Sequence, residues 1–258
     1  MTTTISFGLQ KGGVGKSTTT SITAYLLSQN KKVLAVDLDS QGNLTRLLTQ
    51  KNIYDFEGRT ILEAFQEKTA TKFVYQVTDN LHILPAEDAL AILPNRLTVM
   101  YKTRKEQLSA LSNLLKEFEN VYDYILIDMP PNLGDQTLNA MVASDYTVVV
   151  LQTEPFAFEA LERYLKTLER VREEFNSRLT LAGILTCLMQ TQTSIDRAIR
   201  EQALEDYEDM IFTSVIKRKA RIKEFVWEGI TNKTKVDKVA LENYQSFLEE
   251  LLERVEKG

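Results

Sequence analysis

The 258-residue chain has few of the residues that form disulfide bonds or bind structural metal ions. Cys187 is the one cysteine, so no disulfide can form within the chain, and a Cys-rich zinc site or an iron–sulfur cluster held by one chain is excluded. Proline occurs five times, and no Pro-, Gly- or Ser-rich linker divides the sequence. No stretch reaches the ~20 apolar residues of a membrane-spanning helix, and the N-terminus shows no secretory signal. We therefore expect a single domain, residues 1–258, in a reducing cytoplasm.

Neither sign of charge dominates the sequence. There are 31 Lys and Arg against 36 Asp and Glu, which gives a net charge of -5. This balance argues against a wholly basic nucleic-acid coat but leaves room for a local basic patch. Apolar residues make up 43% and charged residues 26%, as in a globular protein that is long enough to bury a core without a staple.

Short apolar runs alternate with longer stretches of helical period. Seven runs rich in Val, Ile and Leu predict buried strands at Thr4–Leu9, Val33–Leu38, Leu81–Pro85, Tyr124–Asp128, Tyr146–Gln152, Leu181–Leu188 and Met210–Val215. Helices are predicted at Lys16–Gln29, Thr60–Gln66, Lys102–Glu119, Gln136–Ala143, Phe156–Glu174, Ser194–Tyr207 and Lys238–Glu256. The alternation predicts an α/β fold, a doubly wound and mostly parallel sheet flanked by helices, with ligands at the carboxyl ends of the strands.

A glycine-rich loop joins the first predicted strand to the first predicted helix. It reads Lys11-Gly12-Gly13-Val14-Gly15-Lys16-Ser17-Thr18. The glycines allow a tight turn that brings backbone N–H groups onto phosphate oxygens, and the helix N-terminus favours negative charge at the same place. Lys16 can reach the β- and γ-phosphates, and the Ser17 hydroxyl can ligate Mg²⁺. The loop therefore predicts a nucleotide site of the P-loop NTPase type.

The loop departs from the usual G-x-x-x-x-G-K-[ST] pattern, because Gln10 stands at the first glycine and a second lysine, Lys11, heads the loop. It resembles the deviant Walker A motif of the ParA/MinD superfamily, and the whole chain resembles a ParA-type partition ATPase. In that family the extra lysine reaches across a nucleotide-sandwich dimer to the partner's phosphates. The resemblance implies ATP and Mg²⁺ as cofactors, weak partner-stimulated hydrolysis, an ATP-dependent homodimer, and catalytic roles for Lys11 and Lys16.

Two aspartates end the second predicted strand, within the run Val33–Asn43. This run resembles the family's VDLDPQGN element, with Ser40 in place of proline. The resemblance implies that Asp39 orients or activates the attacking water. It also implies that Asp37 supports the magnesium shell or the loop lysines.

The run Tyr124–Pro131 resembles a Walker B strand. A carboxylate at the end of such a strand, here Asp128, can hold Mg²⁺ directly or through water. Met129 replaces the cysteine of the family's DCPP form. The resemblance implies that Asp128–Gly134 is a switch that senses the γ-phosphate.

A cluster of cations lies near the last predicted strand, in a chain with excess acid. It consists of Lys217, Arg218, Lys219, Arg221 and Lys223. In isolation such a run is usually a solvated face. The resemblance implies non-specific DNA binding here, with Arg221 on the family's arginine, and phosphate contacts need charge rather than a base-reading shape. Arg197 and Arg200 could extend the patch, and Trp227 is expected to be a packing residue.

The same resemblance implies that loops near Cys187–Gln190 and Ser214–Lys219 form the adenine pocket. Lys217 stands where the family has proline. The last predicted helix carries an apolar stripe for docking on the domain: Val239, Tyr244, Phe247, Leu248, Leu251, Leu252 and Val255. Its many glutamates give it the wrong charge for an anionic membrane, unlike the basic terminal helix of MinD proteins.

The sequence thus predicts an ATP-dependent DNA-partition ATPase without a preceding helix-turn-helix domain. ATP would form the dimer, the dimer would bind DNA non-specifically, and hydrolysis would release it. The resemblance implies a ParB-type centromere-binding partner, a nucleoid-associated place in the cytoplasm, and no membrane partner. Two alternatives stay open: a MinD-like positioning ATPase that acts on membrane or protein cargo, and a metabolic enzyme with the same loop, such as a ligase.

Overall fold

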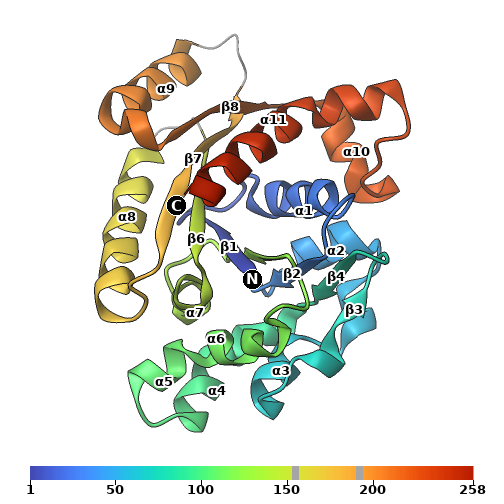
Figure 1. The fold of residues 1–258 in the computed structure, drawn as a ribbon, viewed down its shortest axis with the longest axis vertical. Helices are drawn as coiled ribbons and strands as arrows, with labels where there is room; N and C mark the ends of the chain where they lie inside the picture. Colours follow the sequence, from blue (N-terminus) through green and yellow to red (C-terminus); the bar gives the residue numbers. More distant parts are fainter. Residues whose placement is uncertain (153–156, 190–193, 258) are drawn as a thin grey trace.

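The computed structural model describes residues 1–152, 157–189 and 194–257. Within these ranges eight strands form one sheet in the order β3-β4-β2-β5-β1-β6-β7-β8 (Figure 1). Their bounds are β1 Thr3–Gly8, β2 Val33–Asp37, β3 Tyr75–Gln76, β4 Leu81–Leu84, β5 Tyr124–Asp128, β6 Tyr146–Gln152, β7 Thr180–Met189 and β8 Ile211–Lys217. The β3–β4 pair is antiparallel and the other pairs are parallel. The predicted fold class is confirmed.

Helices cover both faces of this sheet. Their bounds are α1 Lys16–Leu27, α2 Asn43–Thr49, α3 Ile61–Glu67, α4 Leu93–Met100, α5 Arg104–Leu108, α6 Ala110–Leu115, α7 Asp135–Ala143, α8 Ala157–Glu174, α9 Ser194–Tyr207, α10 Ala220–Glu228 and α11 Lys235–Lys257. Helices α1 and α11 pack on one face, and α7 and α8 on the other (Figure 1). The strands β1, β2 and β5 are therefore buried on both sides, as their continuous apolar runs predict.

Several elements differ from the sequence prediction. Helices α2, α4 and α10 and the edge strand β3 were not predicted. The predicted helix Lys102–Glu119 is instead two short helices and a 3-10 turn, because Ser109 leaves the helical conformation between α5 and α6. Thr103 and Glu106 form a capping box that starts α5 two residues later than predicted.

Helix α11 docks its apolar stripe against β8 and α1. Tyr244, Phe247, Leu251 and Val255 are buried, and the ring of Phe247 meets the ring of Phe212 edge-on at 4.9 Å between centroids. The stripe prediction was wrong for Val239, which is 51% exposed. In the part of the chain that the structure describes, no helix has the length and apolar character needed to cross a membrane.

The register of the central strands brings distant segments to one edge of the sheet. Asp128 at the end of β5 is level with Phe7 of β1 on one side and with Asp37 of β2 on the other. The glycine-rich loop leaves β1 immediately beyond this level. The parallel strands thus bring the loop and the two aspartates together, although Asp128 is more than 100 residues from the loop along the chain.

Candidate nucleotide site

The glycine-rich loop takes a conformation that its glycines make possible. Gly13 and Gly15 have φ angles of 76° and 91°, in the left-handed region that favours glycine. Gly15 is also the N-cap of α1. The first amides of this helix have no partner within the helix and point towards the space beside the loop. Val14 between them is fully buried and anchors the loop in the core.

A cleft of about 400 Å³ opens beside the loop. It is lined by Gly12, Gly13, Gly15, Lys16, Ser17, Thr18, Asp39, Gln41, Asn43, Arg46, Leu47, Pro131 and Val226. The structure therefore brings most of the predicted phosphate loop and Asp39 into one site. The described residues of the lining include neither Lys11 nor Lys217, so the adenine contact of Lys217 stays a prediction.

Sequence reasoning missed the far wall of this cleft, which α2 and α10 provide. Arg46 and Leu47 come from α2, and Val226 comes from α10. One signal was available for α2, because a helix that directly follows Asp37 and Asp39 must lie at the carboxyl edge of the sheet. No comparable signal in the sequence placed Val226 there.

Lys16 is folded into the site rather than extended into solvent. Its side chain is 6% exposed, and its Nζ donates a 2.7 Å hydrogen bond to the carbonyl oxygen of Lys11. Burial lowers the pKa of Lys16, while the charges of Asp128 and Asp39 work in the opposite direction. The ammonium thus lies between the loop and the carboxylates, where it can exchange the carbonyl for a phosphate oxygen.

Asp37 has internal partners for both of its oxygens. Its Oδ1 accepts from the amide of Asp39 at 3.1 Å, and its Oδ2 accepts from the amide and the hydroxyl of Thr45 at 2.8 Å each. Burial raises the pKa of Asp37 to about 7 despite these hydrogen bonds. The contacts favour a role in shaping the turn that carries Asp39, and the predicted role in the magnesium shell stays untested.

Asp128 has one satisfied and one unsatisfied oxygen. Its Oδ1 accepts from the Thr20 hydroxyl at 3.3 Å, whereas its fully buried Oδ2 has no hydrogen-bond partner among the described residues. Burial and the neighbouring Asp37 raise the pKa of Asp128 well above its ordinary value, and Ser17 and Lys16 oppose this rise. An orphaned carboxylate oxygen beside a serine hydroxyl fits a hard cation such as Mg²⁺.

No cluster of three or more His, Cys, Asp or Glu side chains that could hold a metal occurs among the described residues. Mg²⁺ commonly completes its shell with phosphate oxygens and water, so the Ser17 hydroxyl and the Asp128 carboxylate fit a metal that is bound together with a nucleotide.

Asp39 and the predicted switch segment also border the site. Asp39 is 9% exposed, and its Oδ1 accepts from the amide of Gln41 at 3.0 Å. In the switch, the carbonyl oxygen of Asn132 accepts from the Thr137 hydroxyl at 2.6 Å, and its Oδ1 accepts from the amide of Gly134 at 3.0 Å. These hydrogen bonds hold the segment after Pro131 in one conformation beside the cleft.

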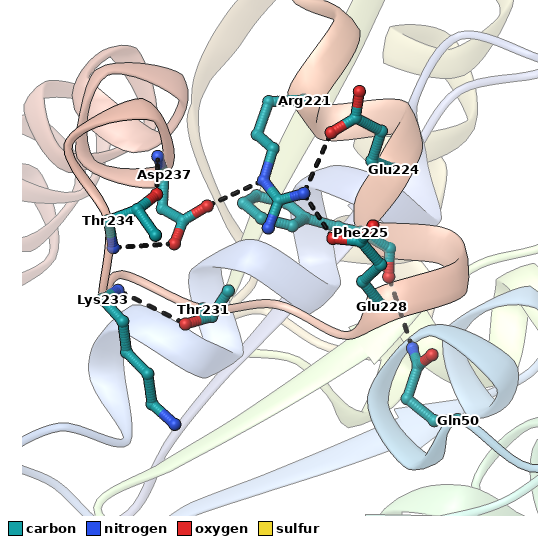
Figure 2. A network of polar contacts seen from close by, with 9 residues as sticks. All are labelled: Gln50, Arg221, Glu224, Phe225, Glu228, Thr231, Lys233, Thr234 and Asp237. Carbon is teal, nitrogen blue, oxygen red and sulfur yellow. Dashed lines mark hydrogen bonds and ion pairs between the residues drawn. The ribbon is translucent and has the colours of Figure 1, made fainter.

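The basic run is divided between the end of β8 and the start of α10. Lys217, Arg218 and Lys223 are exposed, whereas Lys219 is half-buried and donates to the carbonyl oxygen of Val239. Arg221 is 16% exposed and forms ion pairs with three carboxylates (Figure 2). The DNA contact predicted for Arg221 stays untested, and it would have to compete with these pairs.

Two other predictions for this region have different outcomes. The prediction of a packing role for Trp227 was wrong, because this side chain is 86% exposed. The side chains of Arg197 and Arg200, and Gln190 in the predicted adenine pocket, lie outside the part of the chain that the structure describes.

Comparison with known proteins identifies the family. A family model described as an AAA domain matches residues 2–181. The chromosome-partitioning ATPase Soj of Treponema pallidum is 33% identical over 230 residues, which cover 88% of this chain and 87% of the relative. The chain belongs to the ParA/Soj family of partition ATPases. Soj of Thermus thermophilus is 35% identical over 221 residues, which cover 85% of this chain and 83% of that relative.

Solved structures agree with the ParA/Soj fold. A cobyrinic acid a,c-diamide synthase from Mycobacterium smegmatis, solved with ADP and magnesium, aligns with a TM-score of 0.82 at 29% identity and covers 99% of this chain and 96% of that one. A putative plasmid partition protein from Borrelia burgdorferi, solved with AMPPNP, aligns with a TM-score of 0.80 at 24% identity, with coverage of 98% and 100%. At that identity the second likeness shows the fold alone.

Proposed function

We propose that this partition ATPase binds ATP with Mg²⁺ in the cleft and then pairs face to face with a second copy. The paired form binds DNA without sequence preference, and hydrolysis releases it. The observation that carries the proposal is the meeting of the glycine-rich loop, Lys16 and Asp39 in one cleft. Asp128, with its orphaned oxygen, ends the neighbouring strand at the same end of the sheet. In this proposal the protein acts in the cytoplasm on DNA, together with a ParB-type partner that stimulates hydrolysis.

Each polar group of the cleft has a defined task in this cycle. The loop amides and Lys16 take the phosphate oxygens, and Lys16 leaves the Lys11 carbonyl to do so. Ser17 and Asp128 would hold Mg²⁺, which would supply positive charge to offset that of the phosphate groups. Asp39 orients the attacking water, and Lys11 of the second copy completes the γ-phosphate site.

The exposed cations Lys217, Arg218 and Lys223 would provide the DNA contacts. Lys217 ends β8, so the patch lies at the same edge of the sheet as the nucleotide cleft. A dimer presents the patch twice, and DNA phosphates are spaced closely enough to engage both copies. ATP-dependent pairing would therefore switch DNA binding on by doubling the number of phosphate contacts.

A salt titration of ATP-dependent DNA binding tests this proposal. Each neutralised phosphate contributes about -0.9 to the slope of log affinity against log salt on duplex DNA. Replacing Lys223 with alanine removes one contact per protomer, so the slope should flatten by about two units, equally on two unrelated duplexes. Lys31→Ala, at the opposite edge of the sheet, is the matched control and should keep the wild-type slope.

Three outcomes would contradict the proposal. Absence of ATP-dependent DNA binding by the wild-type protein would remove the DNA step, and ATP-dependent pelleting with anionic liposomes would favour the MinD-like alternative. A loss of affinity on only one of the two duplexes would mean that the patch reads sequence.

The similarity to a cobyrinic acid a,c-diamide synthase at 29% identity supports a metabolic enzyme as the second candidate. A partition ATPase should hydrolyse ATP faster when DNA and its protein partner are added. A metabolic enzyme should respond instead to a small-molecule substrate. A screen of ATP turnover with acidic and amide-bearing small molecules, run with and without DNA, distinguishes the two.

A further inference from the structure

The junction between α5 and α6, residues 107–111, is held open by a side chain from α7. In a continuous helix the amide of Leu111 would donate to the carbonyl oxygen of Gln107, four residues earlier. Asn139 takes both places instead. Its Oδ1 accepts from the Leu111 amide at 3.1 Å, and its Nδ2 donates to the Gln107 carbonyl oxygen at 3.1 Å. A side chain inserted into the backbone hydrogen bonds in this way breaks a helix.

Asn139 is fully buried, and both polar atoms of its carboxamide are used. Its Nδ2 also donates to the carbonyl oxygen of Asp135, one turn earlier in α7, at 3.0 Å. Buried polar groups need such partners, and an apolar side chain at this position would give none to Leu111 or Gln107. Helix α7, which lies against β1, α5 and α6 (Figure 1), is therefore fastened to the junction by hydrogen bonds as well as by packing.

A weaker tie joins the same helices at the surface. The Nη2 of Arg104 in α5 donates to the Oδ1 of Asp135, the first residue of α7, at 2.6 Å. The side chain of Arg104 is 48% exposed, and exposed ion pairs contribute little to stability. The buried amide of Asn139 is therefore the main polar link between α7 and the junction.

The other end of this link reaches the nucleotide cleft. Helix α7 begins directly after the predicted switch segment. The hydroxyl of Thr137, which is 1% exposed, donates to the carbonyl oxygen of Asn132 at 2.6 Å. Pro131, the residue before Asn132, lines the cleft. A continuous set of contacts thus runs from the cleft through Asn132 and Thr137 to the buried amide of Asn139.

We infer that Asn139 is a positioning residue for ATP hydrolysis: by fastening α7 to the junction of α5 and α6, it holds residues 131–134 in place beside the nucleotide cleft. Asn139 is not among the described residues that line the cleft, so it acts through Thr137 and Asn132. The loop amides and Lys16 hold the phosphates independently of α7. This inference rests on the proposed function, since it requires ATP in the cleft.

Turnover of an Asn139→Ala variant tests the inference. The turnover number at saturating ATP should fall about 10- to 100-fold, because a misplacement of about 1 Å in a site can cost about 100-fold in rate. Affinity for ADP should stay within about twofold of wild type, because ADP has no γ-phosphate to meet the switch and its binding loop is unchanged.

Asn176 offers a matched control at the other end of α7. Its Nδ2 donates to the carbonyl oxygens of Met141, Val142 and Ser144 at 3.2, 3.1 and 2.7 Å. Asn176→Ala therefore removes three hydrogen bonds that fasten this helix, as Asn139→Ala does. Both variants should lower the free energy of unfolding, but turnover of Asn176→Ala should stay within about twofold of wild type.

Two further variants keep the test available if Asn139→Ala does not fold. Asn139→Asp keeps the size of the side chain and the acceptor for the Leu111 amide but loses both donated hydrogen bonds, so turnover should fall in the same way. Thr137→Val removes the hydroxyl that links α7 to Asn132 and should also slow turnover without changing affinity for ADP. The double variant should be no slower than the slower single variant, because residues that act as a unit are not additive.

The outcomes separate this inference from the proposed function. Folded Asn139→Ala and Asn139→Asp proteins with wild-type turnover would overturn the positioning role. An equal loss of turnover in Asn176→Ala would overturn it too, because any loosening of α7 would then slow the reaction. A matching loss of ADP affinity would place the damage in the phosphate loop instead. A wild-type protein that hydrolyses ATP but neither pairs nor binds DNA, with the expected pattern among the variants, would overturn the proposed function and uphold the role of Asn139.

Discussion

Replacing Lys16 with methionine should weaken ATP binding about 10- to 100-fold. The side chain is 6% exposed and is aimed into the cleft, with its Nζ 2.7 Å from the Lys11 carbonyl oxygen. A hydrogen bond to a charged group contributes about 1.5–3 kcal/mol, which corresponds to roughly 10- to 150-fold in affinity. ATP must first break the hydrogen bond between the Lys16 ammonium and the Lys11 carbonyl oxygen. This cost lowers the upper limit of the expected loss of affinity to about 100-fold.

The same substitution should also act on the nucleotide-free protein, through Asp128. The ammonium of Lys16 opposes the rise in the pKa of Asp128 that burial causes. Without it, Asp128 should bind its proton up to a higher pH. The effects of Lys16→Met and Asp128→Asn on the free energy of unfolding should therefore be non-additive, by about 0.5–3 kcal/mol for groups in one network.

Titration with a fluorescent ATP analogue measures the first effect, and chemical denaturation of the single and double variants measures the second. Lys31→Met removes an exposed lysine at the opposite edge of the sheet and should change neither quantity. A folded Lys16→Met protein with wild-type ATP affinity would refute the assignment of Lys16 to the phosphates. Additive unfolding energies would refute its coupling to Asp128.

Three further predictions follow from the same cleft. Lys11→Ala should keep ATP binding, because Lys16 and the loop amides remain, but should lose ATP-dependent dimerisation and turnover. Light scattering with and without ATP measures this, and normal dimerisation with normal turnover would leave Lys11 as a loop residue only. Asp39→Ala should give a long-lived ATP dimer with slow hydrolysis, whereas wild-type turnover or a monomer would contradict its role with water. Burial raises the pKa of Asp37 from 3.8 to about 7, so between those pH values the folded state keeps a proton that the unfolded state has lost, and the contribution of Asp37 to the free energy of unfolding falls as pH rises. In denaturation experiments the stability of Asp37→Asn relative to wild type should therefore rise as pH is raised from 3.8 to about 7. A stability difference that stays constant over this range would show that Asp37 of the folded protein is ionised throughout it.

The local sequence determined the phosphate loop and the central sheet. The chemistry of the loop lies in eight consecutive residues, Lys11 to Thr18, whose glycines permit the left-handed angles seen at Gly13 and Gly15. The strands β5 and β6 have the bounds that the sequence predicts, because strands buried on both faces must be continuously apolar. Parallel order then brings Asp128 and Asp37 to the loop without any further information.

The tertiary structure alone decided the far wall of the cleft and the state of the basic run. Helices α2 and α10 have seven and nine residues, too few for a clear helical period, and their positions depend on contacts such as Gln50 with Phe225, 175 residues away. Charge in a sequence is a formal sum, whereas the charge that a ligand meets depends on which partners lie within hydrogen-bonding distance. Arg221 therefore belongs to a basic run in the sequence and to an acidic cluster in the fold, because Asp237, Glu224 and Glu228 surround it only after α10 and α11 have formed and packed together.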